Sequence, residues 1–584
     1  MAQGWLQIVV FLIILTALVP LLGGYIAKVF QGERVFLSPL FGPIERFAYR
    51  VLRVRPEEGQ DWKAYARSIV VFSVVSFLLL YLILRTQSIQ PFNPEGFHSG
   101  PWNLSFNTTS SFVTNTNWQY YGGETTLTYF AQMAGLTVQN FVSAAVGIAA
   151  LAAVIRGFVA RSGALLGNFW SDLVRINLYI LLPISFVAAL VLVSQGVIQT
   201  LDGSQAFDTI AGGTQTLSFG PVASQETIKL LGTNGGGFFN VNSAMPFENS
   251  GGLTNFVELM LIIVIPASLT YTFGRMIGNR RQGWALYAAM MTLFIVAVAV
   301  VYLAEQHGSP AQHHAGMATA AFDGSTGGNM EGKEQRFGIS ETSLWTAITT
   351  VTSCGGVNGA FDSLTGIGGL VPTANLATGE VIFGGVGSGL YYMLLFVLLT
   401  VFIAGLMVGR TPEFLGKKIE SREVKLVLVG VLVTPLLVLF ATAWAVASPD
   451  GTQSIFNSGP QGFSESLYAY MSQANNNGSA FAGYTGFIQP NAPGNAGAEA
   501  FSFANLLGGM VMLFSRFLPM IAALAVAGSL AGKKVAPAGA GTFRADSPTF
   551  VVLLIGVVVI VAALTFFPAF LLGPIVQGLT DQLF

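Results

Sequence analysis

Long apolar stretches alternate with polar connections along this chain of 584 residues. Each stretch is about 20 residues long, which is enough to cross the hydrocarbon core of a bilayer as a helix. The ten stretches are Trp5–Val29, Ser68–Leu84, Leu127–Ile155, Leu173–Val193, Leu253–Ile277, Trp284–Leu303, Val381–Val408, Leu426–Ala447, Phe503–Leu530 and Phe550–Gly573. The pattern predicts an all-α polytopic membrane protein with about ten transmembrane helices.

Four shorter amphipathic segments lie between these spans, and each is followed by a loop rich in Thr, Ser, Asn and Gly. The segments are Ser105–Val113, Val222–Leu231, Glu341–Val351 and Ser464–Gln473. They are too short to cross a bilayer. A helix that enters halfway and returns as irregular backbone is tolerated only when it is buried in protein or faces water. Its C-terminal end carries a partial negative charge, which favours a cation in the polar loop.

The polar loops recur at a fixed spacing. They begin at Thr114, Thr233, Thr352 and Met471, which are 119 residues apart each time, and on this register Asn477-Gly478 corresponds to Asn358-Gly359. A fixed period indicates one unit repeated. The alternative, ordinary Gly/Asn-rich turns between spans, does not explain the shared register. We therefore expect four channel-like repeats, each a span, a pore helix, a filter loop and a span, around a pseudo-fourfold pore.

The repeats divide the chain into six parts. Residues 68–160, 161–282, 283–418 and 419–535 are the expected pore repeats. Residues 1–67 would add an N-terminal transmembrane helix with a cytoplasmic loop, and 536–584 a C-terminal helix. The first span has no basic residues before it and is longer than a typical signal core, so we expect it to be retained.

Composition places the repeats in a membrane. The chain is 52% hydrophobic and 9% charged, against roughly 25% charged residues in a soluble domain. No basic face suggests nucleic acid. Cys354 is the single cysteine, which excludes an internal disulfide and a cysteine-based metal site.

Most of the 27 Lys and Arg fall in alternate connections. By the positive-inside tendency these are cytoplasmic, so both termini are external and the polar loops open from outside.

Five strings resemble those of the potassium-binding A subunits of Kdp-type potassium-pumping ATPases. They are Thr114–Gln119, Gly232–Asn240, Thr352–Asn358, Gln473–Phe481 and Gly409–Lys418. The chain is more distantly similar to Trk/Ktr potassium transporters and tetrameric potassium channels. The resemblance covers essentially the whole chain.

The resemblance implies a K⁺ selectivity filter at the matching positions, with K⁺ as the transported ion. Gln119 would sit at the filter entrance. Cys354 is either a small buried apolar residue or a filter residue acting through its carbonyl, and its position in the loop favours the second. The residues implied to form the filter are Thr114, Asn115, Thr116, Thr233, Asn234, Gly235, Ser353, Cys354, Gly355, Asn475 and Asn476.

Two features lie below the expected filter. Gly384, Gly385, Gly387 and Gly389 interrupt the second span of the third repeat, either for close helix packing or, as the family suggests, as a loop that obstructs straight passage. Arg516 is a charge inside an apolar span. It either pairs with a structural partner or faces inward and repels cations from the exit. Arg410 would help at the membrane edge or serve as a positive-inside anchor.

The sequence contains no Gly-x-x-x-x-Gly-Lys-Ser/Thr loop and no Asp-Lys-Thr-Gly string, so we expect that this chain does not hydrolyse ATP by itself. Separately, the resemblance implies partners. A P-type ATPase catalytic subunit would use ATP and Mg²⁺, accompanied by a small single-span subunit and a third subunit anchored by one span. The complex would lie in a bacterial or archaeal plasma (inner) membrane. The alternative is a stand-alone passive potassium channel or transporter of the Trk/Ktr type. A membrane scaffold without transport leaves the polar loops unexplained.

Overall fold

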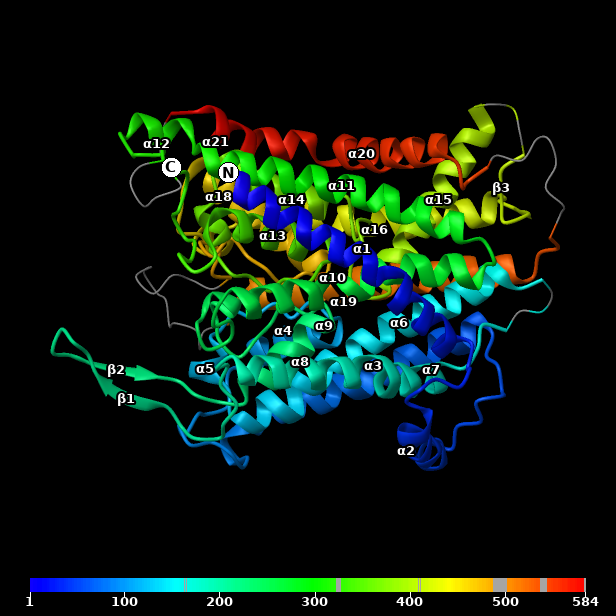
Figure 1. Cartoon of the computed structure of the whole chain (residues 1–584), viewed down its shortest axis with the longest axis horizontal. Helices are drawn as coiled ribbons and strands as arrows, with labels where there is room; N and C mark the ends of the chain where they lie inside the picture. The colour runs from blue at the N-terminus through cyan, green and yellow to red at the C-terminus, as the bar shows by residue number, and fades with distance from the viewer. Residues whose placement is uncertain are drawn as a thin grey trace.

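The computed structural model describes residues 1–161, 163, 165–321, 327–407, 409, 411–486, 501–535 and 544–581. Within these ranges ten helical segments are long and apolar enough to cross a membrane. Most of them run side by side along the longest axis of the molecule (Figure 1). The prediction of an all-α polytopic membrane protein is therefore confirmed.

The spans are assembled from the following helices. The outer pair is α1 (Ala2–Phe30) and α20 (Pro548–Phe570), the latter continued by the π-helical η7 (Leu571–Ile575) and by α21 (Val576–Leu579). The first repeat has α3 (Trp62–Arg85) and α6 (Val138–Val159), which follows the π-helical η2 (Ala131–Thr137). The second has α7 (Phe169–Ile176), π-helical η3 (Asn177–Leu181) and α8 (Leu182–Ser194) as one span, and α10 (Gly252–Met276) as the other. The third has α11 (Arg280–His307), α14 (Gly366–Ala377) and α15 (Ser388–Met407), and the fourth has α16 (Ser421–Ala447) and α19 (Phe503–Ala531).

Four short helices lie between the spans of the repeats, and we call them the pore helices. They are α4 (Trp102–Val113), α9 (Val222–Leu231), α13 (Gly338–Val351) and α18 (Gly459–Ala474). Their C-terminal ends match the predicted ends to within one residue. Three of them begin earlier than predicted, and their N-cap residues are Pro101, Phe337 and Ser458.

The remaining elements are short and mostly lie in connections. They are α2 (Ser38–Leu52), η1 (Gln87–Ile89), α5 (Gly123–Thr126), η4 (Asn242–Ala244), α12 (Pro310–His314), η5 (Phe361–Ser363), α17 (Pro449–Thr452) and two antiparallel hairpins. The hairpins pair β1 (Gln205–Asp208) with β2 (Thr214–Leu217) and β3 (Glu413–Phe414) with β4 (Lys417–Lys418).

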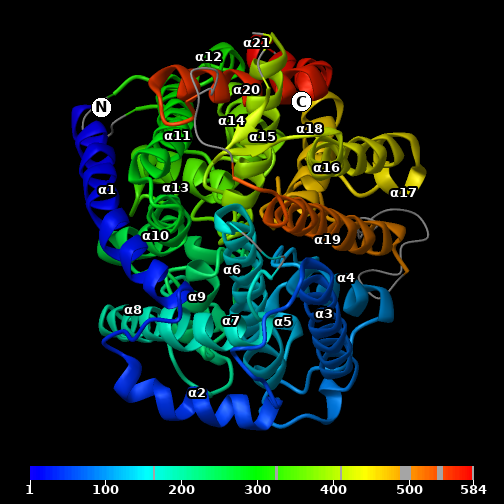
Figure 2. The same cartoon turned by 90° about the vertical axis from the view of Figure 1, so that its right-hand side faces the viewer.

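The four repeats surround a common centre. Figure 2 looks along the spans and shows helices of all four repeats around the middle, with α1 and α20 at the periphery. Helix α6 contacts α19, so the first repeat lies beside the fourth, while α1 packs on α10 and α20 on α11 and α15. The central helix α6 is buried over nearly its whole length, and many of its buried residues are small, such as Ala149 and Ala153. Small residues allow close helix packing inside a membrane.

The two ends of the molecule differ in charge. The N-terminus and the last described residues of the C-terminus lie at the same end as the β1–β2 hairpin (Figure 1). Helix α2 and the β3–β4 hairpin lie at the opposite end, which we call the basic end because most Lys and Arg are in its connections. We call the first end the filter end.

Candidate ion filter

Every pore helix ends in the same backbone motif. The residue after the C-cap has a left-handed conformation, and the next N–H returns to the carbonyl of the helix six residues back, counting both ends, as in a Schellman motif. The left-handed residues are Asn115 (φ 71°), Thr233 (φ 49°), Ser353 (φ 49°) and Asn476 (φ 51°). The returning bonds run from Thr116 to Ser111 (2.9 Å), Asn234 to Lys229 (2.7 Å), Cys354 to Thr349 (2.9 Å) and Asn477 to Ser472 (2.8 Å).

This motif corrects the register of the repeats. The equivalent residues are Thr116, Asn234, Cys354 and Asn477, so the spacing is not a constant 119 residues. Asn477-Gly478 corresponds to Cys354-Gly355, and the predicted match to Asn358-Gly359 is wrong. The physical reason is that the end of each pore helix sets the position of its loop, while the connections before it differ in length.

The loops after the pore helices, which we call the filter strands, are bonded around a closed ring to a neighbouring strand or, in one case, to the neighbouring pore helix. Asn115 Nδ2 of the first strand donates to the carbonyl of Thr233 (3.1 Å), and Cys354 Sγ of the third donates to the carbonyl of Asn234 (3.2 Å). In the fourth repeat, Asn477 Nδ2 donates to the Thr349 carbonyl (2.8 Å). Asn476 Nδ2 closes the ring by donating to Thr116 Oγ1 (2.9 Å). All four repeats therefore meet at one site.

Backbone carbonyls of different repeats come close together there. A methyl group placed on Gly235 would come within 2.8 Å of the carbonyl oxygens of both Cys354 and Asn477. A methyl group on Gly478 would overlap the carbonyl oxygen of Thr116. Glycine is thus required by the close approach of another backbone. Carbonyl dipoles brought together from four segments are a chemical environment in which a cation can replace its water.

Every predicted filter residue lies in one of these four segments, which the structure brings together. The sequence reasoning missed Asn477 and Gly478, because it placed the fourth segment by the constant period. In three of the four motifs the fourth residue is left-handed, namely Asn117 (φ 57°), Gly355 (φ 98°) and Gly478 (φ 102°), and an Asn or Gly at this position is the signal that marks them.

Hydroxyl groups of two pore helices hold the filter strands from behind. Thr349 Oγ1 accepts the backbone N–H of Gly355 (2.9 Å), and Ser472 Oγ accepts that of Gly478 (2.9 Å). Both hydroxyls are buried, and both belong to the residue whose carbonyl receives the returning bond. Sequence reasoning missed this support, although a hydroxyl residue five positions before Cys354 and before Asn477 was visible in the sequence.

The second repeat has Lys229 at the equivalent position. Its ammonium group is fully buried and lies 2.6 Å from Glu226 Oε2 and 3.0 Å from Glu248 Oε2. Glu248 Oε1 in turn accepts the backbone N–H of Phe239 (2.9 Å), just beyond the second filter strand. A buried charge of this kind is stable only when it is paired. The cluster therefore fixes the second strand by ion pairs where the third and fourth strands use hydroxyls.

A vestibule opens at the filter end. It is a cavity of about 1250 Å³ whose lining includes Asn117, Gln119, Gly235, Gly355 and Gly478. Gln119 Oε1 accepts the backbone N–H of Gly237 (3.1 Å), so this side chain joins the first strand to the second at the mouth of the filter. The structure thus places Gln119 between the filter strands and the vestibule.

The glycine-rich segment lies against the other side of the filter. Residues 378–387 form a loop between α14 and α15, so the predicted interruption of this span is present. Val386 N–H donates to Thr233 Oγ1 (3.0 Å), and Gly384 N–H donates to the carbonyl of Val351, the last residue of α13 (2.8 Å). Of the predicted glycines, Gly385 and Gly387 are also in the loop, while Gly389 is in the first turn of α15.

Arg516 is not an unpaired charge. Its side chain is 3% exposed, and its Nη1 lies 3.8 Å from Oε1 of the buried Glu380, which belongs to the same loop. Glu380 also accepts the Gly385 N–H (3.3 Å) and the Ser388 hydroxyl. The ion pair supports the expected alternative of a structural partner for Arg516, and the role of Arg516 as a barrier to cations at the exit stays a prediction. Arg410 lies outside the residues that the structure describes.

Comparison with known proteins gives consistent matches over the whole chain. A family model described as potassium-transporting ATPase A subunit matches residues 9–579. A protein of Granulibacter bethesdensis is 52% identical over 577 residues, covering 99% of this chain and 98% of its own length. Proteins of Mesorhizobium japonicum (577 residues) and Rhizobium rhizogenes (578 residues) are 53% identical with the same coverage. All three are named potassium-transporting ATPase potassium-binding subunit.

Proposed function

Because the chain belongs to the family of potassium-transporting ATPase A subunits, we propose that it is the potassium-binding and translocating subunit of an ATP-driven high-affinity potassium uptake pump. The names of its relatives favour this function over a stand-alone passive transporter of the Trk/Ktr type. The chain selects K⁺ at the filter and delivers it to the ATPase subunit.

The observation that carries the proposal is the closed ring of four filter strands. Hydrogen bonds join strands one and two, two and three, and four and one, and the fourth strand is bonded to the pore helix α13 of the third repeat. The strands differ in sequence, so amide and hydroxyl groups such as those of Asn115 and Thr116 join the carbonyls. A rigid, unequal ring suits selective binding of one ion more than rapid conduction.

The ion reaches the filter from outside the cell. The positive-inside tendency makes the basic end cytoplasmic, so both termini and the vestibule are external, and the membrane is the bacterial or archaeal plasma (inner) membrane. K⁺ enters past Gln119 and is held among Thr116, Asn234, Cys354 and Asn477 and the residues beside them.

Passage straight through the chain is obstructed by the loop of residues 378–387. Its contacts with Thr233 and with the end of α13 support this role. The Arg516–Glu380 pair holds the loop against α19. The ion therefore leaves the filter sideways, toward the ATPase subunit.

The energy comes from a partner chain. The relatives' names describe a subunit of a potassium-transporting ATPase. In the proposed complex a P-type catalytic subunit hydrolyses ATP with Mg²⁺, and a small single-span subunit and a single-span-anchored third subunit complete the assembly. This chain contributes the K⁺ site and no hydrolytic step.

Equilibrium binding tests the proposal directly. Purified chain in detergent is titrated with K⁺ in a background of choline, and then with Na⁺, by isothermal titration calorimetry. We expect saturable K⁺ binding and much weaker Na⁺ binding. Absence of K⁺ binding, or equal affinity for both ions, would refute a potassium filter in this chain.

A further inference from the structure

Helix α2 lies across the basic end of the molecule. Figure 1 shows it end-on at the edge of the bundle, and Figure 2 shows its full length along the same edge. Its axis is therefore roughly at right angles to the spans, in the plane that a membrane surface would occupy. Amphipathic helices that rest in the headgroup region have this orientation.

One face of α2 is apolar and exposed. Leu40, Ile44, Phe47 and Val51 follow one another at intervals of four, three and four residues, which places them on one side of a helix. They are 64%, 48%, 63% and 62% exposed. Phe36, 78% exposed, precedes the helix. We call these five residues the α2 stripe.

The opposite face of α2 is fixed to the second repeat by polar contacts. Glu45 Oε1 accepts from Arg175 Nη1 (3.0 Å) of α7, and Glu45 Oε2 accepts the hydroxyl of Tyr179 (2.5 Å) of η3. Phe41 packs edge-on against Tyr179, with ring centroids 6.0 Å apart. These contacts set the rotation of the helix, so the stripe has to face away from the protein.

A row of arginines flanks the stripe. Arg46, Arg50 and Arg53 are four and three residues apart and exposed, and they form no ion pair within the described part of the chain. Glu45 is the only acidic residue of α2, and Arg175 already pairs with it. The flank is therefore a line of uncompensated positive charge beside an apolar surface.

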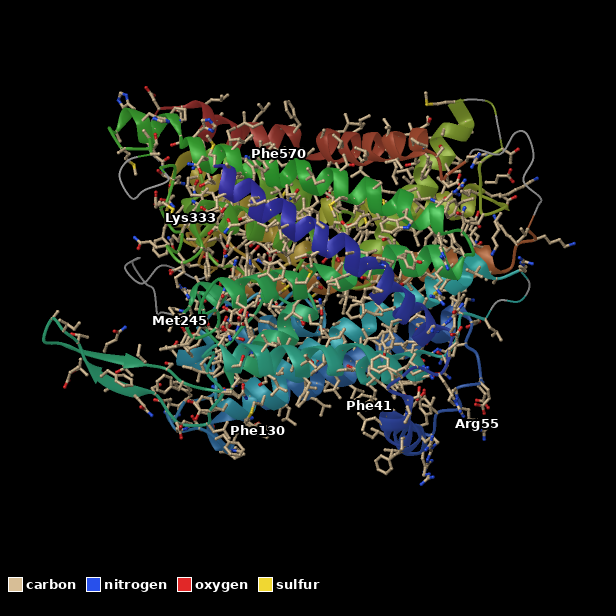
Figure 3. All side chains as sticks on the ribbon, viewed as in Figure 1. Phe41, Arg55, Phe130, Met245, Lys333 and Phe570 are labelled. Carbon is tan, nitrogen blue, oxygen red and sulfur yellow. The ribbon has the colours of Figure 1, made fainter. Side chains whose placement is uncertain are left out.

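The stripe is continuous with the lipid-facing surface of the spans. Tyr179, which contacts Phe41, belongs to the turn just before α8. The exposed side of α8 carries Phe186 (62% exposed) and Leu190 (58% exposed). Figure 3 shows Phe41 on the side of α2 toward the spans and Arg55 at the outer limit of the basic end. Phe41 is three residues before Ile44 and four before Glu45, so it lies between the stripe and the face that is fixed to the protein. The stripe is therefore placed beside the apolar surface of α8, while Arg55 lies toward the aqueous side of the basic end.

We propose that α2 is a binding site for anionic phospholipid, in which the α2 stripe enters the acyl region and Arg46, Arg50 and Arg53 bind headgroup phosphates. The charge complementarity of the arginine row and the continuity with α8 identify the occupant. The proposal does not depend on which ion the filter selects.

The first test measures lipid contact without altering the arginines. Cys354 is fully buried, so a cysteine introduced as Phe47→Cys can be labelled alone with a bimane fluorophore. The assembled complex and the isolated chain are placed in phosphatidylcholine nanodiscs containing nitroxide-labelled phosphatidylcholine. We expect strong quenching at Phe47→Cys and weak quenching at the control Glu57→Cys. Equal quenching at both sites would overturn the proposal. Weak quenching of Phe47→Cys in the complex but not in the isolated chain would also overturn it, because a partner protein would then cover the stripe.

The second test measures preference for charge. Quenching at Phe47→Cys is compared for trace nitroxide-labelled phosphatidylglycerol and phosphatidylcholine, and we expect the anionic probe to quench more. A basic residue near an anionic surface adds on the order of a fivefold preference, so Arg46→Gln, Arg50→Gln and Arg53→Gln together should lower the ratio by at least about twofold. The control changes Arg280, Arg281 and Arg422 of the basic end to Gln and should leave the ratio unchanged. If the two probes quench Phe47→Cys equally in the protein that keeps all three arginines, selection of anionic headgroups is excluded.

Discussion

Individual residues of the filter strands meet backbone requirements as well as chemical ones. Thr233 is β-branched and left-handed, a conformation that such residues rarely adopt. Its hydroxyl donates to the Gly232 carbonyl and accepts the Val386 N–H. These bonds stabilise a strained residue at the contact between filter and loop. Strain held by the surrounding structure is common at functional sites.

Replacement of Gly235 by Asp should weaken K⁺ binding. The new side chain would meet the carbonyl oxygens of Cys354 and Asn477, so the strands have to move apart and the ion loses ligands of fixed geometry. We expect the K⁺ affinity to fall at least about tenfold, which is about 1.4 kcal/mol, with reduced discrimination against Na⁺. Calorimetric titration of the purified variant measures both effects.

Gly252→Asp is the matched control for this change. No atom lies within 4 Å of an added methyl group at Gly252, which begins α10. An acidic residue in the first turn of a helix is favourable, so this variant should bind K⁺ as the parent does. An unchanged affinity in Gly235→Asp would contradict the assignment of the second filter strand.

The hydroxyl of Thr349 provides a subtler test of the filter. Thr349→Val keeps the shape of the side chain but leaves the buried N–H of Gly355 without its acceptor, at a cost of about 1–3 kcal/mol. We expect weaker K⁺ binding, with recovery in Thr349→Ser. Thr346→Val is the control, because the Thr346 hydroxyl donates to the Thr342 carbonyl within α13. Equal loss in both valine variants would show that the effect is general destabilisation.

Glu465 in α18 should make stability depend on pH. Burial, together with the nearby Asp362, raises the pKa of Glu465 from 4.5 to about 7. The folded protein therefore binds this proton more tightly than the unfolded chain, and the stabilisation, complete below pH 4.5, is lost as the pH rises to about 7. Thermal unfolding in detergent between pH 4.5 and 8 measures this slope. Glu465→Gln should flatten it, and an unchanged slope would assign the effect to other groups.

At the scale of elements, the sequence was sufficient for features that depend on local composition. The ten spans follow from apolar length, and the ends of the pore helices follow from the change to Thr, Asn and Gly. The register of the fourth filter strand did not follow, because a Schellman motif is defined by backbone conformation at Asn476 and not by a constant period.

Contacts between elements could not be predicted in the same way. The sequence shows Arg516 as a charge in an apolar span, but its partner Glu380 lies in a different repeat. Glu226 and Lys229 are three residues apart on α9, a spacing that the sequence shows, but the second partner Glu248 comes from a loop that follows the helix. Pairings of this kind depend on the packing of whole repeats, which no local pattern specifies.

The loop of residues 378–387 and its ion pair should control leakage. Deleting Gly384–Gly389 removes the contacts with Thr233 and with α13, so K⁺ should flow through liposome-reconstituted complex without ATP under an imposed potential. Arg516→Met leaves Glu380 buried and unpaired, which is strongly unfavourable, and should also uncouple hydrolysis from uptake. The double change Arg516→Met with Glu380→Gln removes both charges. It should recover the stability of the fold, while the K⁺ leak should remain. Variants as tight and coupled as the parent would place the barrier elsewhere.

At the scale of the whole molecule, four repeats build one site that no repeat could form alone. Hydrogen bonds between the repeats hold the four filter strands together, so the proposed K⁺ site exists only in the assembled ring. The two outer spans, α1 and α20, cover the second and third repeats rather than the centre. They provide surface in the membrane without contributing to the filter.

The proposed division of labour between this chain and its partner can be tested on the whole complex. The sequence contains no nucleotide-binding or phosphorylation motif, so the purified chain should hydrolyse no ATP at any K⁺ concentration. Adding the P-type subunit should produce K⁺-stimulated hydrolysis through a phosphorylated intermediate. Because the K⁺ site lies in this chain, Gly235→Asp should shift the K⁺ concentration for half-maximal hydrolysis while leaving the maximal rate nearly unchanged. ATPase assays across K⁺ concentrations measure both quantities. Two results would show that ion selection and energy supply are not divided in this way. One is ATP hydrolysis by this chain alone, and the other is an unchanged K⁺ concentration for half-maximal hydrolysis in Gly235→Asp.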